Sequence, residues 1–202
     1  MGNIDLVCVE GYLQRKDIRQ RVLKCFHVAL NDHSRGFVVR LDIRFPQGFM
    51  HDGSNSLLSE LLRRVKIHYS YEGDVRPKVS CEYVWVREQH RSETPHYHLL
   101  LLLGGSEIQN GWGVRSVVAG KWSRLLKGDF GACIHLCPPA YDASGILIQR
   151  PTEHAEGWKL LAEIDEFEAA HAAAFNWACY LAKIYTKGSA PHGVREFGSS
   201  QF

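Results

Sequence analysis

The stretch of sequence that decides the fold is Pro95-His96-Tyr97-His98-Leu99-Leu100-Leu101-Leu102-Leu103. It predicts a β-strand, and because side chains alternate between the two faces of a strand, His96 and His98 share one face while Tyr97 lies on the other. The leucines that follow make both faces apolar, which predicts a strand in the middle of a sheet. Two histidines at the start of such a strand can hold a divalent cation, although a His-x-His pair alone is more often a hydrogen-bonded surface or core feature.

The composition is that of a globular protein with a substantial core. The 202 residues suit one domain, and 45% of them are hydrophobic. The net charge is only +2, so a nucleic-acid site has to be a local patch. The N-terminus lacks the features of a signal peptide, no stretch is long enough to span a membrane, and the six cysteines form no CxxC pair. We therefore expect a cytoplasmic protein with reduced thiols and no membrane partner.

Residues 37–45 predict a second strand, because apolar and polar side chains alternate along this segment. The side chains expected to face the core are Phe37, Val39, Leu41, Ile43 and Phe45. Those expected to face solvent are Arg40, Asp42 and Arg44.

Residues 79–89 predict a third strand, which a short polar link joins to the His-Tyr-His strand. A link of this length suits an antiparallel hairpin. The hairpin places the end of one strand, with Glu88 and the nearby His90, beside the start of the next, with His96 and His98. The sequence therefore predicts that a carboxylate reaches the two histidines.

The remaining pattern predicts helices between these strands. We expect one domain, residues 1–202, with an N-terminal helix at 11–31, further helices at 56–69, 116–127 and 169–187, an acidic helical insertion at 152–168 and a flexible tail at 188–202. Two adjacent antiparallel strands among helices favour an α+β fold, in which helices pack on one side of a central antiparallel sheet.

The predicted last helix carries the third chemical feature. At 3.6 residues per turn, Tyr180, Lys183 and Lys187 share one face of this helix. Taken alone, Tyr180 suits an amphipathic tyrosine at a surface with lysines in solvent nearby.

Together, Glu88, His96-Tyr97-His98, Tyr180 and Lys183 resemble the HUH endonucleases, which nick single-stranded DNA and are named for a His-hydrophobe-His motif. The strongest similarity within that superfamily is to the rolling-circle replication initiators of filamentous phages and their prophage relatives. The segment 180–187, Tyr-Leu-Ala-Lys-Ile-Tyr-Thr-Lys, agrees with it. The resemblance implies a ferredoxin-like or RRM-like arrangement of sheet and helices.

The resemblance also implies the site residues. Glu88, His96 and His98 would hold Mg²⁺ or Mn²⁺, with His90 and Gln89 as rivals of Glu88 for the third ligand position.

The nucleophile implied by the resemblance is Tyr180, which would form a 5′-phosphotyrosine while Lys183 balances the charge of the phosphate. Two-tyrosine relatives carry their second tyrosine four residues after the first, where this chain has Ile184. Because Tyr185 would face elsewhere on a helix, we expect a single catalytic tyrosine.

The expected partner is single-stranded DNA at a replication origin in a bacterial cell. By charge alone, backbone contacts are predicted at Arg63, Arg64, Lys183, Lys187 and Arg195. No Walker motif is present, so unwinding and synthesis would need a host helicase and polymerase. The alternatives are a relaxase or transposase of the same superfamily, or a DNA-binding module without catalytic activity.

Overall fold

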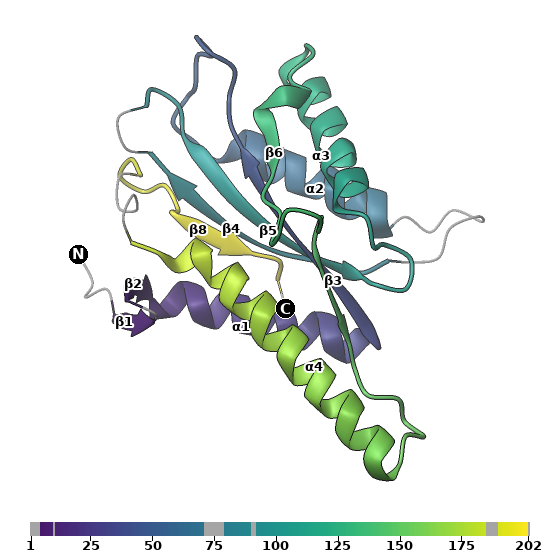
Figure 1. Ribbon diagram of the computed structural model, residues 1–202. Helices are drawn as coiled ribbons and strands as arrows, with labels where there is room; N and C mark the ends of the chain where they lie inside the picture. Colours follow the sequence, from purple (N-terminus) through teal and green to yellow (C-terminus); the bar gives the residue numbers. More distant parts are fainter. Residues whose placement is uncertain (1–4, 10, 71–78, 90–91, 185–189, 202) are drawn as a thin grey trace.

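The structure is a computed structural model that describes residues 5–9, 11–70, 79–89, 92–184 and 190–201. An antiparallel sheet of six strands lies between helices on both of its faces (Figure 1). The predicted α+β class and the antiparallel sheet are confirmed. The expectation that helices cover only one side of the sheet is wrong, because the leucine-rich strand is apolar on both faces and needs cover on both.

The centre of the fold is a βαββαβ unit. Its elements are β3 (Arg35–Ile43), α2 (Ser56–Ser70), β4 (Cys81–Glu88), β5 (His96–Gly104), α3 (Gly111–Leu126) and β6 (Ile134–Leu136). The strands lie in the order β6-β3-β5-β4, so the first and third strands of the unit form its middle. This is the predicted ferredoxin-like arrangement. Two further strands, β7 (Ile146–Gln149) and β8 (Phe197–Ser199), pair with β3 and β4.

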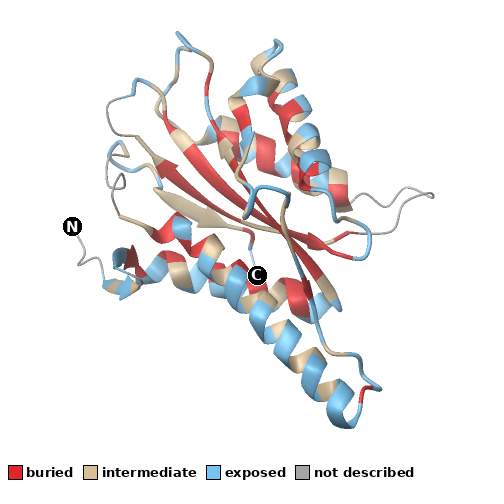
Figure 2. Cartoon of the chain, in the orientation of Figure 1, coloured by how far each residue is buried: buried red, intermediate tan, exposed pale blue. Residues whose placement is uncertain are grey.

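One face of the sheet packs against α2 and α3. Leu99 and Leu101 of β5 are fully buried there, and each such leucine contributes roughly 1.5–3 kcal/mol to folding. Trp122 of α3 is also fully buried, and its indole N–H donates to the carbonyl of Arg44 at 3.0 Å. This face is therefore closed by apolar packing (Figure 2).

The other face packs against helices from the two ends of the described chain. The elements here are α1 (Lys16–Asp32), α4 (Gly157–Ala178), the 3₁₀ turn η2 (Cys179–Ala182) and the hairpin of β1 (Leu6–Val9) and β2 (Tyr12–Arg15); a second 3₁₀ turn, η1 (Gly131–Cys133), precedes β6. Leu100 and Leu102 of β5 pack here against Phe26 of α1. The side chains of β5 therefore divide between two cores.

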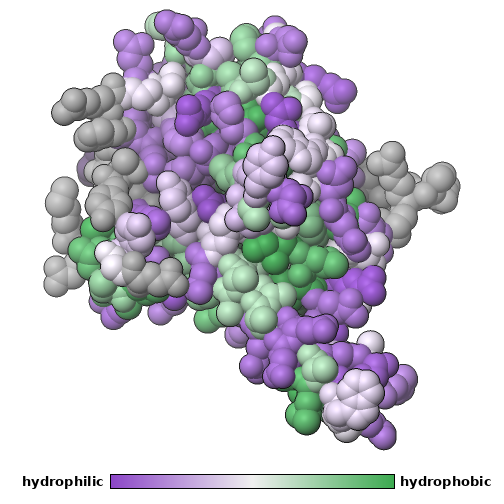
Figure 3. All heavy atoms as spheres, in the orientation of Figure 1, coloured by the Kyte–Doolittle hydropathy of each residue, from purple (hydrophilic) through white to green (hydrophobic). Residues whose placement is uncertain are grey.

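Two predicted helix boundaries differ from the structure. Helix α1 begins at Lys16 rather than near residue 11, because Tyr12–Arg15 pairs with β1. Helix α4 is one continuous helix, so residues 152–168 do not form a separate insertion. Its first turns project beyond the sheet, where Trp158 is 82% exposed (Figures 1 and 3).

The predicted flexible tail contains a strand of the sheet. The amide of Arg87 donates to the carbonyl of Glu196 at 2.7 Å, and β8 follows. A Cβ at Gly198 would lie 2.8 Å from the Trp85 ring, so this close approach requires glycine. The expectation of a loose tail is therefore wrong for residues 197–199.

Candidate functional site

Three adjacent strands bring the polar residues together. In the antiparallel register His96 of β5 lies opposite Glu88 of β4, and His98 lies opposite Asp42 of β3. Their neighbours Val86, Leu100 and Val38 belong to the core under α1 and α4, and the alternation of side chains places all four polar residues on that same face. The predicted approach of Glu88 to the histidines is confirmed.

His98 lies between two carboxylates. Its Nδ1 is 2.6 Å from Asp42 Oδ1, and its Nε2 is 3.0 Å from Glu88 Oε2. An ionised carboxylate only accepts hydrogen bonds, so both ring nitrogens carry protons in this arrangement. Burial alone would lower the pKa of His98, but the bonds to Asp42 and Glu88 outweigh it and raise that pKa. Burial likewise opposes the charge of Asp42, yet the two histidines lower the pKa of that carboxyl well below its usual range.

The donor set fits a divalent cation. Ligand atoms of Asp42, His96 and His98 all lie within 4.8 Å of one another. His96 Nε2 lies 3.2 Å from Asp42 Oδ2, yet it is buried and has no hydrogen-bond partner among the described residues. A cation would satisfy this nitrogen, and either Asp42 or Glu88, which contact opposite nitrogens of the His98 ring, would supply the carboxylate ligand. Two imidazoles and a carboxylate form a mixed nitrogen and oxygen donor set that a divalent cation can use.

Asp42 is a site residue that the sequence reasoning missed, because it was expected to face solvent. Arg40 is also misplaced by that reasoning, since it is buried under α4, whereas Arg44 is exposed as expected. The signal was available: strict alternation along residues 37–45 places Asp42 on the face opposite the first core. Only the pairing of β3 with β5 shows that this second face carries the histidines.

Tyr180 lies against this cluster from η2. Its ring meets that of His98 edge-on at 5.7 Å between centroids, and it remains 42% exposed. The guanidinium carbon of Arg40 lies 4.4 Å from the ring centroid, and Lys183 Nζ lies 4.7 Å from it. One cavity of about 260 Å³ is lined by Asp42, Arg44, Glu88, His96, His98, Tyr180 and Lys183. The structure thus brings together the predicted metal ligands, the predicted nucleophile and the predicted lysine.

The predicted helix over residues 169–187 ends early. Helix α4 stops at Ala178, where Arg40 Nη1 donates to the Trp177 carbonyl at 3.0 Å. The chain then turns through η2, and the amide of Ile184 donates to the carbonyl of Leu13 in β2. At Lys183 and Ile184, pairing with the N-terminal hairpin therefore replaces the predicted helix.

Tyr180 and Lys183 nevertheless stay together, because residues three apart eclipse one another in a 3₁₀ turn. Their expected proximity is confirmed, although not on an α-helix. Three residues considered from the sequence, His90, Tyr185 and Lys187, lie outside the described residues.

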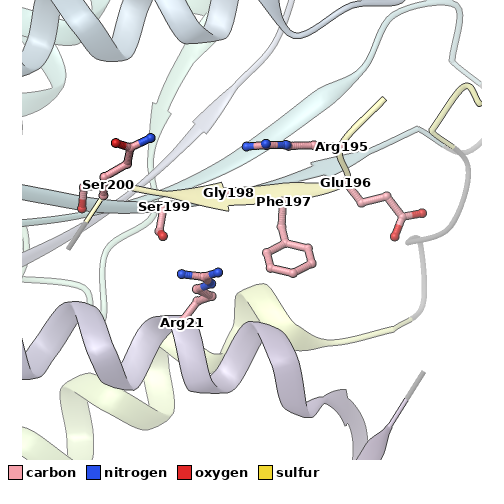
Figure 4. Close-up of a pocket in the computed structure, with 8 residues that line it drawn as sticks. Arg21, Arg195, Glu196, Phe197, Gly198, Ser199 and Ser200 are labelled. Carbon is pink, nitrogen blue, oxygen red and sulfur yellow. The ribbon is translucent and has the colours of Figure 1, made fainter. Parts of the chain in front are cut away.

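The other predicted DNA contacts do not gather at this site. Arg63 and Arg64 both bind Glu60 on α2, on the opposite side of the sheet. Arg195 lines a separate groove of about 490 Å³ beside β8, together with Arg21 of α1 (Figure 4). Within the described residues, Lys183 alone of the predicted DNA-binding residues lies in the candidate site.

No helix in the described part of the chain is long and apolar enough to cross a membrane.

Comparison with known proteins finds a relative in Escherichia coli strain K12, the uncharacterized protein YfjJ. It is 23% identical over 208 residues, which cover 91% of this chain and 93% of the relative. No solved structure matches. The pattern of the YagK/YfjJ C-terminal domain matches residues 9–200, and the chain therefore belongs to the YagK/YfjJ C-terminal domain family.

Proposed function

We propose that this protein is a metal-dependent endonuclease of the HUH type, which nicks and rejoins single-stranded DNA through Tyr180. The observation that carries the proposal is the shared cavity, in which an exposed tyrosine meets a cluster of two imidazoles and two carboxylates. An exposed phenol beside a candidate cation site is an arrangement suited to covalent phosphoryl transfer to a protein.

The cluster would hold the cation through His96, His98 and a carboxylate. When bound, a divalent cation neutralises the charge of the scissile phosphate and orients it. Glu88 is the ligand that faces His98 Nε2, while Asp42 holds the other ring nitrogen. We therefore assign Glu88 as the third ligand and Asp42 as the residue that fixes the ring, in line with carboxylate–histidine–metal arrangements in general.

The Tyr180 oxygen would attack the phosphorus in line with the bond to the 3′-oxygen. A new bond joins the tyrosine oxygen to phosphorus, the bond from phosphorus to the 3′-oxygen breaks, and the proton lost by the phenol is balanced by one gained on the 3′-hydroxyl. The products are a 5′-phosphotyrosine and a free 3′-end, and the reverse reaction rejoins the strand. Arg40 and Lys183 add positive charge beside the ring, where the phosphate would lie.

The biological setting follows from this chemistry. A free 3′-hydroxyl primes synthesis, so we propose that the protein initiates rolling-circle replication of a phage or related mobile element. Its partners would be a single-stranded origin and a host helicase and polymerase in the bacterial cytoplasm. A relaxase or transposase would use the same site. These roles differ in the DNA that is cut: the replication origin of a phage, the transfer origin of a plasmid or the end of a transposon.

The test is covalent capture of DNA. The protein is mixed with single-stranded oligonucleotides from its own genetic neighbourhood, with Mn²⁺ or with EDTA, and resolved on a denaturing gel. We expect an adduct that survives denaturant, needs the metal and is lost in Tyr180→Phe.

Tyr141→Phe is the matched control, because Tyr141 is fully exposed and outside the candidate site. An adduct that persists in Tyr180→Phe and disappears in Tyr185→Phe would move the nucleophile to Tyr185. Binding of DNA with no adduct for any oligonucleotide would favour the DNA-binding module without catalytic activity.

A further inference from the structure

A second cavity lies on the other side of Tyr180 from the metal cluster. Its volume is about 270 Å³, and its lining residues are Tyr12, Gln14, Arg40, Asn176, Trp177, Tyr180 and Lys183. Tyr180 and Lys183 belong to both cavities. Whatever occupies the second cavity therefore lies next to the group that reacts in the first.

The N-terminal hairpin builds one wall of this cavity. The backbones of Gln14 in β2 and Lys183 form an isolated antiparallel β-bridge, and the amide of Ile184 donates to the Leu13 carbonyl. This pairing places the Tyr12 ring 3.8 Å from Lys183 Nζ, so one ammonium group lies close to the rings of Tyr12 and Tyr180. Trp177 of α4 also lines the cavity, with the Arg40 guanidinium carbon 5.2 Å from its ring centroid.

The polar groups and rings of the cavity favour a planar ligand with hydrogen-bond acceptors. Among the described residues no carboxylate lines it, in contrast to the neighbouring cavity. Gln14 is buried and its side-chain oxygen already accepts from Arg19 at 2.6 Å, so its amide N–H groups are what it offers to a ligand. Arg40 binds the Trp177 carbonyl through one nitrogen and has further N–H groups on its planar fork.

We propose that this cavity binds one nucleobase of single-stranded DNA, next to the phosphate that Tyr180 attacks. The inference rests on the proposed function and names a determinant of its substrate. Aromatic rings and guanidinium planes are the surfaces on which unpaired bases stack. The volume of about 270 Å³ lies just below the usual range of ligand pockets, roughly 300–1,000 Å³, which suits one base rather than several.

The two cavities act together through Lys183. In the free protein its ammonium group lies over the Tyr12 ring. A phosphate in the metal cavity draws the ammonium group toward itself, because an ion pair is stronger than a contact with a neutral ring. The Tyr12 ring is then left to the neighbouring base, whose carbonyl oxygens meet the amide of Gln14 and the Arg40 guanidinium.

The experiment measures the contribution of the bases separately from that of the phosphates. Binding of a labelled oligodeoxythymidine and of an abasic oligomer of the same length is followed by fluorescence anisotropy in EDTA. Every register of a homopolymer offers the same base to the cavity, so the natural origin is not needed. We expect the full-length protein to prefer oligodeoxythymidine, and Tyr12→Ala to weaken its binding by about 5- to 150-fold while leaving the abasic oligomer unaffected.

Tyr12→Phe keeps the ring and should bind as the native protein does. Tyr141→Ala removes an exposed tyrosine elsewhere and should change nothing. Tyr12 is 42% exposed, so its removal is compatible with folding, which a thermal melt verifies.

Equal binding of the two oligomers by the native protein would overturn the base pocket, as would a Tyr12→Ala variant that weakens both oligomers alike. The covalent capture assay separates this failure from that of the proposed function. If a covalent adduct forms but the two oligomers bind equally, the proposed nicking activity is supported and only the base pocket is rejected. If no adduct forms with any oligonucleotide, the proposed activity itself is rejected.

Discussion

The ends of strands β4 and β5 carry two polar clusters, one on each face of the sheet, and the two differ in how their groups are paired. On the α2 side, Arg87 Nη1 donates to the Gly53 carbonyl at 2.8 Å and to Asn55 Oδ1 at 3.0 Å. The Tyr97 hydroxyl also donates to Asn55 Oδ1 at 3.0 Å. Arg87 Nη1 and the Tyr97 hydroxyl meet acceptors here, Arg87 Nε alone of that guanidinium has no hydrogen-bond partner among the described residues, and Arg87 is 2% exposed.

On the α4 side, acceptors are in excess and the cluster is open. Glu88 and Asp42 both face His98, while His96 Nε2 has no hydrogen-bond partner among the described residues. Tyr180 borders the opening. Adjacent residues of the same strands thus form a closed structural network on one face and a candidate cation site on the other. The comparison shows that charge balance and access, rather than polarity alone, separate a site from a polar core.

The largest effect is expected on stability, from creating a cavity in the core under α2 and α3. Leu101→Ala removes a fully buried side chain under α2 and α3, which should lower the free energy of unfolding by about 2–5 kcal/mol. Urea denaturation measures the change. Manganese binding by the folded protein should remain, and a loss below about 1 kcal/mol would show that this core rearranges to fill the space.

The next effect separates the two faces by function. His96→Ala removes a candidate ligand whose Nε2 lies 3.2 Å from Asp42 Oδ2 without forming a hydrogen bond, so we expect metal affinity to fall at least about 100-fold with a much smaller change in stability. Isothermal titration with Mn²⁺ and a thermal melt measure the two quantities. Tyr97→Phe, one residue away on the closed face, is the control and should keep its metal affinity while losing about 1 kcal/mol of stability. A variant of His96 that binds Mn²⁺ normally would contradict the site.

A smaller effect separates the roles of the two carboxylates. If Asp42 orients His98 and Glu88 binds the cation, Asp42→Asn should weaken Mn²⁺ binding by about 10- to 100-fold. Glu88→Gln should weaken it further, because it removes a charged ligand. The reverse order of the two affinities, measured by the same titration, would exchange the two assignments.

The smallest effect is a pH dependence of stability on the closed face. Burial lowers the pKa of His51, and the nearby charge of Arg87 lowers it further. Because the folded protein resists this protonation, the stabilising contribution is present above the ordinary histidine pKa of about 6.5 and is lost as the pH falls below it toward the folded value. We expect His51→Asn, whose amide oxygen can accept from the Gly53 amide as Nδ1 does, to reduce the loss of stability between neutral and mildly acidic pH by a fraction of a kcal/mol. Urea midpoints at both pH values measure it, and an unchanged slope would mean that His51 protonates freely in the folded state.

Much of the candidate site can be predicted from local sequence, and the errors of that prediction have a common cause. The hairpin from β4 to β5 brings Glu88 to His96 and His98 because the link between the strands is short. Asp42 was missed because it comes from β3, which is distant in sequence and reaches His98 only through the register of the sheet. The helix predicted beyond Ala178 shows the same limit, since its amphipathic pattern gives no sign that β2 offers the backbone another partner.

The sequence by itself determined the strands, the face shared by His96 and His98, and the approach of Glu88, because these depend on side-chain alternation and on a short hairpin. The tertiary structure alone decided that Asp42 completes the cluster and that Tyr180 leaves the helix to lie against His98. It also decided that Tyr12 meets Lys183. Each of these contacts joins segments far apart in the chain, and only the packing of α4 and the N-terminal hairpin onto the second face of the sheet brings them together.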